Sequence, residues 1–249
     1  MEFDKVALIS AAGGPMGAVI ARRLSSVGYA VALNDRSQSR LTAVVESITE
    51  DGGQVLGLAG DAAKRSTARE LVKAAVHRWG RVDALVNVAG GVRGSLNVPL
   101  EDIGDDDWTG TVDLNLTSAF VFMQEAGRVM LSARGGKIVN IGSTSWSGSP
   151  DRSHYAASKA ALFALTRSAA TQWASRGINV NIVMPGATVT TVADRDDGTW
   201  VDAWAEHNPL GRPNQPDDIA DAVEFLISES SRNISGQALT VAGGLNPSL

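Results

Sequence analysis

The chain has 249 residues and a formal net charge of −5, which argues against a nucleic-acid-binding surface because such a surface usually shows a basic excess. It contains no cysteine, which excludes disulfides, thiol catalysis and thiolate metal sites and fits the reducing, cytoplasmic location that we expect. No apolar run reaches 18 residues and the first five residues lack the features of a signal peptide, so we expect neither a membrane span nor secretion.

Apolar, β-branched runs alternate with segments of helical periodicity along the chain. The predicted strands are Lys5–Ser10, Tyr29–Asp35, Gln54–Ala59, Val82–Val88, Lys137–Ser143, Asn179–Met184 and Ala238–Val241. The predicted helices cover approximately Gly14–Val27, Ser37–Asp51, Lys64–Trp79, Asp105–Ala133, Arg152–Arg176 and Pro216–Ser228. This alternation predicts an α/β fold, a Rossmann-like, doubly wound, seven-stranded parallel sheet with helices on both faces. No linker divides the chain, so we expect one domain over residues 1–249.

The first predicted strand runs into a glycine-rich turn, from Ser10 to Gly17, ahead of the first helix. In such a turn the backbone N–H groups approach a pyrophosphate, and the helix N-terminus stabilises its charge. Pro15 suits the first helical turn, where its missing N–H costs little. Taken alone, the pattern also fits simple close packing of a strand on a helix.

Polar residues end the next three strands. Asp35 ends the second strand, where a carboxylate accepts hydrogen bonds from an adenosine ribose and repels a 2′-phosphate, which favours NAD over NADP. Arg36 argues for NADP, because a guanidinium can pair with the 2′-phosphate. The alternative for Asp35 is that it is simply a turn residue after the strand. Asp61 ends the third strand and is a candidate for bonding adenine or for capping the next helix. The small residues from Asn87 to Gly90 leave room for a ribose.

Tyr155 and Lys159 are four residues apart, which places them on one face of a predicted helix. A free Tyr has a pKa of about 10 and is a poor proton carrier at neutral pH. A neighbouring ammonium favours the phenolate and lowers the pKa of the phenol towards the working range of a general acid/base. The alternative is that both are solvated side chains on an amphipathic helix.

Together these features resemble a short-chain dehydrogenase/reductase of the single-domain type, and the resemblance extends from about Val6 to Gly244. The family motifs fall on Ser10–Gly17, Asn87–Gly90, Asn115, Ser143, Tyr155 with Lys159, Pro185–Gly186 with Thr190, and Ser235–Gly244. The resemblance implies a dinucleotide-binding catalytic domain.

The resemblance also implies four catalytic residues, Asn115, Ser143, Tyr155 and Lys159. Tyr155 would exchange a proton with the alcohol or carbonyl oxygen, and Ser143 would hydrogen-bond that oxygen. Lys159 would lower the pKa of Tyr155 and bond the nicotinamide ribose, and Asn115 would hold a water that continues the proton relay. Read singly, Ser143 also fits the end of a strand, and Asn115 a polar group satisfied within a kinked helix.

The implied reaction interconverts a secondary alcohol and a ketone with NAD(H), with NADP as the less favoured cofactor. The implied cofactor-binding residues are Ser10, Ala12, Gly13, Met16, Gly17, Asp35, Arg36, Asp61, Ala62, Asn87, Ala89, Gly90, Tyr155, Lys159, Pro185, Gly186, Thr188 and Thr190. One alternative is an NADPH-dependent 3-oxoacyl-thioester reductase, against which Asp35 argues. The other, from a different class, is an NAD-binding sensor or scaffold without turnover.

A few residues depart from the family pattern. Ala11 and Pro15 stand where the family has its first two glycines, so we expect an altered loop or weaker pyrophosphate binding. Val88 replaces the second Asn of the strand-four motif, which removes polar contacts. Ala242 replaces a common Asp near the C-terminus, and we expect this to affect local structure only.

Candidate substrate residues follow the fourth, fifth and sixth strands, and they are Arg93, Ser145, Trp146, Trp200, Trp204 and His207. Segment 188–212 is predicted to form a substrate loop that closes when substrate binds. The tryptophans favour an apolar or ring-containing substrate, unless Trp200 and Trp204 only pack a helix onto the core. Arg93 is either an anchor for a carboxylate or a solvated loop residue. The three histidines lack ligand spacing, so we expect no metal.

The predicted helices Asp105–Ala133 and Arg152–Arg176 are long, and the second is rich in alanine, whose small side chain permits close helix approach. In the family, these helices build a four-helix dimer contact, and the C-terminus joins a second interface. We therefore expect a homotetramer, with a dimer as the alternative. The other expected partner is a small alcohol or ketone.

Overall fold

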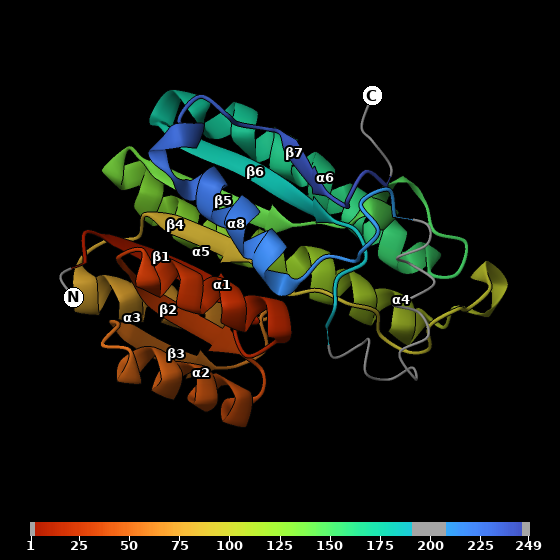
Figure 1. Cartoon of the computed structure of the whole chain (residues 1–249), viewed down its shortest axis with the longest axis horizontal. Helices are drawn as coiled ribbons and strands as arrows, with labels where there is room; N and C mark the ends of the chain where they lie inside the picture. Colours follow the sequence, from red (N-terminus) through yellow and green to blue (C-terminus); the bar gives the residue numbers. More distant parts are fainter. Residues whose placement is uncertain (1–2, 191–207, 246–249) are drawn as a thin grey trace.

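The computed structural model describes residues 3–190 and 208–245 of the chain. Within these residues, seven strands form one parallel sheet in the order β3-β2-β1-β4-β5-β6-β7 (Figure 1). The strands are β1 (Lys5–Ser10), β2 (Tyr29–Asp35), β3 (Val55–Ala59), β4 (Ala84–Asn87), β5 (Gly136–Ile141), β6 (Ile178–Pro185) and β7 (Ala238–Val241). The strand order reverses between β1 and β4, which confirms the predicted doubly wound sheet.

Helices cover both faces of the sheet. They are α1 (Pro15–Ser26), α2 (Gln38–Glu50), α3 (Arg65–Trp79), α4 (Asp105–Val112), α5 (Ser118–Ala133), α6 (Ser153–Trp173) and α8 (Pro216–Ile227). The helices α1, α2 and α8 pack on one face around a core that includes Ile9 and Leu33, whereas α3, α5 and α6 pack on the other around Leu8 and Phe122 (Figure 1). Leu8 and Ile9, which are neighbours in β1, thus pack into different cores, as expected of a parallel strand buried on both faces.

Short 3₁₀ turns join some of these elements. They lie at Leu100–Asp102, Thr144–Ser147, Ala174–Arg176 and Glu229–Ser231. The predicted helix Arg152–Arg176 therefore consists of α6 followed by one such turn, which ends at Gly177 with a φ of 75°. Across the described parts of the chain, no helix is long and apolar enough to cross a membrane.

The predicted helix Asp105–Ala133 changes its hydrogen bonding part-way. Between α4 and α5, Asp113–Thr117 forms a π-helical turn that contains the fully buried Asn115. The Asn115 amide group donates to the carbonyls of Gly91 (2.7 Å) and Thr111 (2.8 Å), and its oxygen accepts from the Gly91 N–H (3.0 Å). Turns of this kind often occur at functional sites, and this one carries a predicted catalytic residue.

The turn between β1 and α1 keeps its shape despite its unusual residues. Ala11 has a φ of 51°, a left-handed conformation that normally selects glycine, and it occupies the position of the family's first glycine. The methyl group makes this conformation cost about 1–2 kcal/mol. Pro15 is the first residue of α1, where a missing N–H is tolerated. The two departures therefore leave the turn intact, at the cost of local strain.

Gly17 is the residue of this turn that tolerates a side chain least. A Cβ at this position would overlap the carbonyl oxygen of Ala11 and lie 2.8 Å from the Cα of Ala12. We expect Gly17→Ala to lower the free energy of unfolding by about 1–3 kcal/mol, as overpacking of a rigid site does, when unfolding is followed in urea.

The matched control is Gly135→Ala, because a Cβ on Gly135 meets no atom within 4 Å. It should change the free energy of unfolding by less than about 0.5 kcal/mol. Equal losses from the two substitutions would show that the contact between Gly17 and Ala11 is not what limits the turn.

Candidate active site

The carboxyl ends of the parallel strands meet along one edge of the sheet, where the glycine turn and the start of α6 also lie (Figure 1). Asp35, the last residue of β2, is only 3% exposed. Its carboxylate accepts hydrogen bonds from the backbone N–H groups of Gly13 (3.0 Å) and Ser37 (2.8 Å). One carboxylate therefore ties the glycine turn to the end of β2.

Ser10 joins the same turn to the end of β4. Its hydroxyl oxygen accepts hydrogen bonds from the N–H groups of Val88 (3.0 Å) and Ala89 (3.2 Å). Val88 takes part through its backbone, so its apolar side chain leaves this contact intact. The buried Asn87 donates to the Asn140 side chain on β5 at 2.8 Å. The hydrogen bonds of Ser10 and Asn87 thus hold the carboxyl ends of β1, β4 and β5 together.

Other predicted cofactor residues have local partners. Asp61 is exposed and accepts a hydrogen bond from the N–H of Ala63 at 2.9 Å within the turn before α3. The N-cap of α3 is Lys64, so Asp61 does not cap this helix as the alternative prediction had it. Ala12 is fully buried, and its N–H donates to the carbonyl of Asn34 at 2.8 Å. The side chain of Arg36 is exposed.

The end of β6 is packed closely against the end of β7. After Pro185, the N–H of Gly186 donates to the carbonyl of Val241 at 2.8 Å. A Cβ on Gly186 would lie 2.9 Å from the Cβ of Ala242, so two small residues meet here and the effect of Ala242 is local packing. The Thr188 hydroxyl donates to the carbonyl of Gly186 at 3.1 Å, which keeps this predicted cofactor residue at the same edge.

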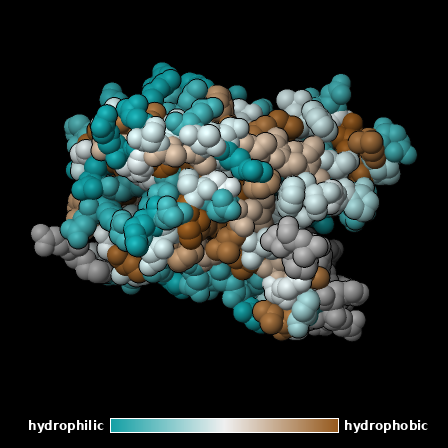
Figure 2. Space-filling view, turned by 90° about the horizontal axis from the view of Figure 1, so that it is seen from above, coloured by the Kyte–Doolittle hydropathy of each residue, from teal (hydrophilic) through white to brown (hydrophobic). Residues whose placement is uncertain are grey.

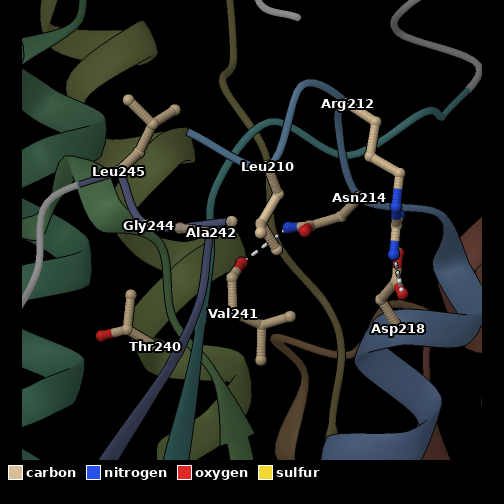
Figure 3. A pocket seen from close by; sticks show the side chains of 10 residues that line it. Leu210, Arg212, Asn214, Asp218, Thr240, Val241, Ala242, Gly244 and Leu245 are labelled. Atoms are coloured by element: carbon tan, nitrogen blue, oxygen red, sulfur yellow. Dashed lines mark hydrogen bonds and ion pairs between the residues drawn. The ribbon is translucent and has the colours of Figure 1, made fainter. Parts of the chain in front are cut away.

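A cavity of about 490 Å³ opens between the end of β7 and the segment before α8 (Figure 3). Its lining residues are Leu210, Arg212, Asn214, Asp218, Thr240, Val241, Ala242, Gly243, Gly244 and Leu245. The guanidinium of Arg212 pairs with the carboxylate of Asp218 at 2.7 and 2.9 Å, and Asn214 donates to the carbonyl of Val241 at 2.6 Å (Figure 3). These polar groups bond to one another, and no predicted catalytic residue lines the cavity.

Lys159 lies at the centre of the site and is 2% exposed. Its ammonium donates to the carbonyl of Ile141, the last residue of β5, at 2.8 Å. Gly90 makes room for it, because a Cβ there would lie 2.8 Å from Nζ of Lys159 and 2.9 Å from Oδ1 of Asn115. Burial lowers the pKa of Lys159 to about 7.

Tyr155 lies one helical turn before Lys159, whose Nζ is 5.6 Å from the centre of the phenol ring. Burial raises the pKa of Tyr155, while the Ser143 hydroxyl and the positive charge of Arg152 act in the opposite direction. Lys159 is not among the groups that lower this pKa here, and its role in lowering it stays a prediction. Burial penalises the charged forms of both side chains.

Ser143, the residue after the Gly142 that follows β5, begins a 3₁₀ turn that fixes its position. Its hydroxyl oxygen accepts a hydrogen bond from the N–H of Ser145 at 3.1 Å. Ser143, in the turn after β5, and Tyr155 on α6 therefore face each other, with Lys159 behind them. Three of the four predicted catalytic residues are brought together here. The fourth, Asn115, lies near Lys159, because its Oδ1 and the Lys159 Nζ both pack against Gly90.

The predicted substrate residues are less clearly gathered. The Trp146 ring packs against Phe163 on α6, with 5.2 Å between ring centres. The Arg93 side chain lies along α4, since a Cβ on Gly110 would be 3.2 Å from its Cγ. Both residues therefore have packing partners of their own. The remaining candidates, Trp200, Trp204 and His207, lie outside the described residues.

Comparison with known proteins places the chain in a family. The family model described as Enoyl-(Acyl carrier protein) reductase matches residues 11–246. A 3-oxoacyl-[acyl-carrier-protein] reductase from Staphylococcus aureus is 35% identical over 247 residues, which cover 98% of this chain and 99% of the relative. The chain is a short-chain dehydrogenase/reductase. The resemblance seen in the sequence is thereby confirmed.

Other members of this family are similar over nearly their whole length. The (2S)-[(R)-hydroxy(phenyl)methyl]succinyl-CoA dehydrogenase subunit of Thauera aromatica is 33% identical over 241 residues, covering 97% of this chain and 96% of the relative. The structure of actinorhodin polyketide ketoreductase with NADPH has a TM-score of 0.93 at 31% identity and 100% coverage of both chains. That of NAD⁺-bound xylitol dehydrogenase has a TM-score of 0.91 at 29% identity, covering 96% of this chain and 98% of that one.

The glycine turn of this short-chain dehydrogenase/reductase fits a nicotinamide dinucleotide. No side chain caps the first turn of α1, whose N-cap is Gly14, so its N–H groups are available to a pyrophosphate. Gly13 and Gly17 have no space for a Cβ, because Arg40 and Asp35 pack against Gly13 and the backbone of the turn packs against Gly17. In residues 3–190 and 208–245, no three His, Cys, Asp or Glu side chains are placed to hold a metal ion.

Sequence reasoning missed two arginines of this dehydrogenase/reductase site. Arg40 pairs with Asp35, with 3.3 Å between Nη2 and Oδ1. Arg152 precedes α6, and its charge acts on Tyr155 three residues later. Side chains in a first helical turn point back towards the N-terminus, and residues three apart share a face. Arg40 lies three residues after Ser37, the N-cap of α2. Arg152 is the N-cap of α6 and lies three residues before Tyr155. This spacing was the signal that could have found the two arginines.

The low pKa of Lys159 predicts that folding depends on pH. The unfolded chain carries this lysine with its ordinary pKa of 10.5, so between about pH 7 and pH 10 the unfolded state binds more protons than the folded state. The free energy of unfolding then rises with pH through this group. We expect the wild type to gain stability over Lys159→Met as pH rises through this interval, measured by urea unfolding at each pH.

Lys73→Met serves as the control, because Lys73 is exposed on α3. Its stability difference from the wild type should stay flat over the same interval. A flat difference for Lys159→Met as well would mean that the buried amine keeps an ordinary pKa in the folded protein.

Proposed function

We propose that the chain interconverts a 3-hydroxyacyl and a 3-oxoacyl thioester, using NAD(H). The observation that carries the oxidoreductase chemistry is the half-buried phenol of Tyr155, set between Ser143 and Lys159 at the carboxyl end of the sheet. The substrate class is supported by two relatives, whose names give a 3-oxoacyl carrier-protein thioester and a hydroxyl-bearing succinyl thioester of coenzyme A. The sequence alone favoured a general secondary alcohol, and the relatives favour its thioester alternative.

The connections that follow β4, β5 and β6 also carry exposed apolar side chains. Several large apolar side chains remain exposed on the connections that follow β4, β5 and β6, namely Leu96, Leu100, Trp146 and Leu210. Figure 2 shows polar side chains over one end of the face it draws and more apolar ones towards the other end. Apolar groups at a binding edge contribute contact area for an acyl chain.

The protein's own groups position and protonate the substrate. When bound, a nicotinamide dinucleotide supplies or accepts the hydride. In the reductive direction, Tyr155 donates its phenolic proton to the ketone oxygen as the alcohol forms, and Ser143 donates a hydrogen bond to the same oxygen. Lys159 lies one helical turn from Tyr155 and would bond the nicotinamide ribose of a bound dinucleotide. The residues that would hold the dinucleotide include Gly13, Gly17 and Asp35.

The preference for NAD(H) is supported by Asp35. Its carboxylate is nearly buried at the end of β2, against the glycine turn, where an adenosine ribose is expected. A negative charge at that place opposes a 2′-phosphate. Solved relatives include both an NAD⁺-bound and an NADPH-bound member of the family, so the family alone does not choose.

A sensor or scaffold that binds NAD without turnover has less support. That alternative depended on damage to the cofactor site by Ala11, Pro15 and Val88. Ala11 adopts the left-handed conformation the turn needs, and Pro15 takes the first helical position. Val88 keeps its backbone hydrogen bond to Ser10. A homotetramer stays part of the proposal, from the long helices α5 and α6.

The test is reduction of acetoacetyl-CoA with NADH, compared with oxidation of xylitol by NAD⁺. We expect turnover of the thioester, and we expect Tyr155→Phe to lower its kcat by about a hundredfold or more while NADH binding changes by less than about threefold, since only a proton carrier is lost. Xylitol oxidation without thioester reduction would overturn the substrate class.

The chain offers a matched control for this variant, because Tyr29 is its one other tyrosine. Tyr29 is the first residue of β2, so it lies at the amino end of the strands, away from the candidate site at their carboxyl ends. Its hydroxyl lies 3.5 Å from the carbonyl of Ile227. Tyr29→Phe should leave kcat within about threefold of the wild type. Equal activities of the two variants would remove Tyr155 from the mechanism.

A further inference from the structure

Three consecutive residues at the start of α6 carry buried polar atoms that have no partner. They are Arg152, Ser153 and His154, the N-cap and the first two residues of the helix. Among residues 3–190 and 208–245, seven buried side-chain nitrogen or oxygen atoms lack a hydrogen bond, and four of them are Nε of Arg152, Oγ of Ser153 and the two ring nitrogens of His154. Buried polar groups normally have a partner. This turn therefore has hydrogen-bonding capacity that the described residues do not use.

Arg152 adds an unpaired charge to this turn. A guanidinium stays protonated at physiological pH, and its partial burial is costly unless an anion pairs with it. The side chain is half-buried, and it forms no ion pair within the described parts of the chain, whereas Arg212 pairs with Asp218. Asp151, the residue before it, is exposed and does not pair with it either. The first turn of α6 has no acidic residue, so the positive end of the helix adds to the same charge.

This charge lies beside the reacting groups. Arg152 precedes Tyr155 by three residues, which is less than one helical turn. Its positive charge acts on the Tyr155 phenol, as the hydroxyl of Ser143 also does. The loop after β4 reaches the same point, because the N–H of Val98 donates to the carbonyl of Asp151 at 3.0 Å. Arg152 is therefore next to both the proton donor and one of the connections predicted to contact substrate.

A carboxylate on the acyl part of the substrate is the anion that fits this place. An anion held by Arg152 must lie close to the carbonyl that Tyr155 protonates, because the two residues are less than one helical turn apart. The phosphates of coenzyme A are separated from that carbonyl by the whole pantetheine arm, whereas a carboxylate a few carbons away is within reach. The two oxygens of a carboxylate also match the parallel N–H donors of a guanidinium.

We propose that Arg152 selects 3-oxoacyl thioesters that carry a free carboxylate a few carbons beyond the ketone. The inference rests on the proposed function and names the substrate class more narrowly. The carboxylate accepts hydrogen bonds from the guanidinium, and this contact places the ketone oxygen within reach of Tyr155 and Ser143. An uncharged acyl chain of the same length leaves Arg152 without a partner, so it is the poorer substrate.

The experiment compares the reduction of 3-oxoadipyl-CoA and 3-oxohexanoyl-CoA by NADH, two thioesters that differ in a carboxylate or a methyl group at the far end. The readout is the ratio of their kcat/KM values. We expect the wild type to favour 3-oxoadipyl-CoA by about tenfold or more, the effect of one charge-assisted contact, and Arg152→Gln to abolish this preference.

Two further variants serve as controls. Arg152→Lys keeps the positive charge but loses the planar set of donors, so it should retain part of the preference. Arg22→Gln removes an exposed arginine from α1 and should leave the ratio within about twofold of the wild-type ratio.

Two results overturn the proposal. One is a wild type that reduces both thioesters equally well or prefers 3-oxohexanoyl-CoA. The other is an Arg152→Gln variant that loses both activities by the same factor, because the ratio then stays unchanged and Arg152 supports only the fold or the Tyr155 phenol.

Binding separates this proposal from the proposed function. Both thioesters are titrated by calorimetry, with NADH present, into Tyr155→Phe and into the double variant Tyr155→Phe/Arg152→Gln. We expect tighter binding of 3-oxoadipyl-CoA to the first and no preference in the second. If the wild type reduces neither thioester but this difference in binding is found, the proposed function fails and the role of Arg152 stands. If binding shows no preference, the role of Arg152 is overturned.

Discussion

The burial of Lys159 is the constraint on which the rest of the active site depends. Its ammonium needs a hydrogen-bond acceptor, and the carbonyl of Ile141 at the end of β5 provides one at 2.8 Å. It also needs a neighbour without a side chain, which is Gly90 just after β4. The parallel pairing of β4 with β5, in which Asn87 lies opposite Asn140, brings these two strand ends to one level. The ends of β4 and β5 therefore supply both the acceptor and the space that the buried amine of Lys159 requires.

Buried hydrogen bonds then hold the other catalytic elements to this centre. The Asn140 side chain accepts from Asn87 at 2.8 Å and donates to Thr166 on α6 at 2.9 Å, so the catalytic helix is tied to the sheet at a second point. The Asn115 side chain is occupied by Gly91 and its own helix, which makes it a residue that positions the loop after β4. Positioning by neutral groups avoids the cost of burying further charges.

Sequence patterns predicted most of the fold because strands buried on both faces and amphipathic helices leave strong signals. The errors are at element ends, as where Val82–Val88 was predicted and β4 spans Ala84–Asn87. The π-helical turn at Asn115 was not predictable, because it depends on hydrogen bonds to Gly91, a contact between segments 24 residues apart. Motifs named the candidate catalytic residues, but the pKa of Tyr155 depends on burial, which only the packed structure defines.

The raised pKa of Tyr155 bears on the protonation state in which this residue acts. Reduction needs the phenol protonated at the start, and burial keeps it so at neutral pH. Oxidation needs the phenolate, which a nearby cation favours, yet the pKa of Lys159 of about 7 leaves only part of its population charged. A further positive charge beside Tyr155, such as that of an oxidised nicotinamide ring, would lower its pKa. Burial therefore favours the protonated form of Tyr155, which is the form that donates a proton.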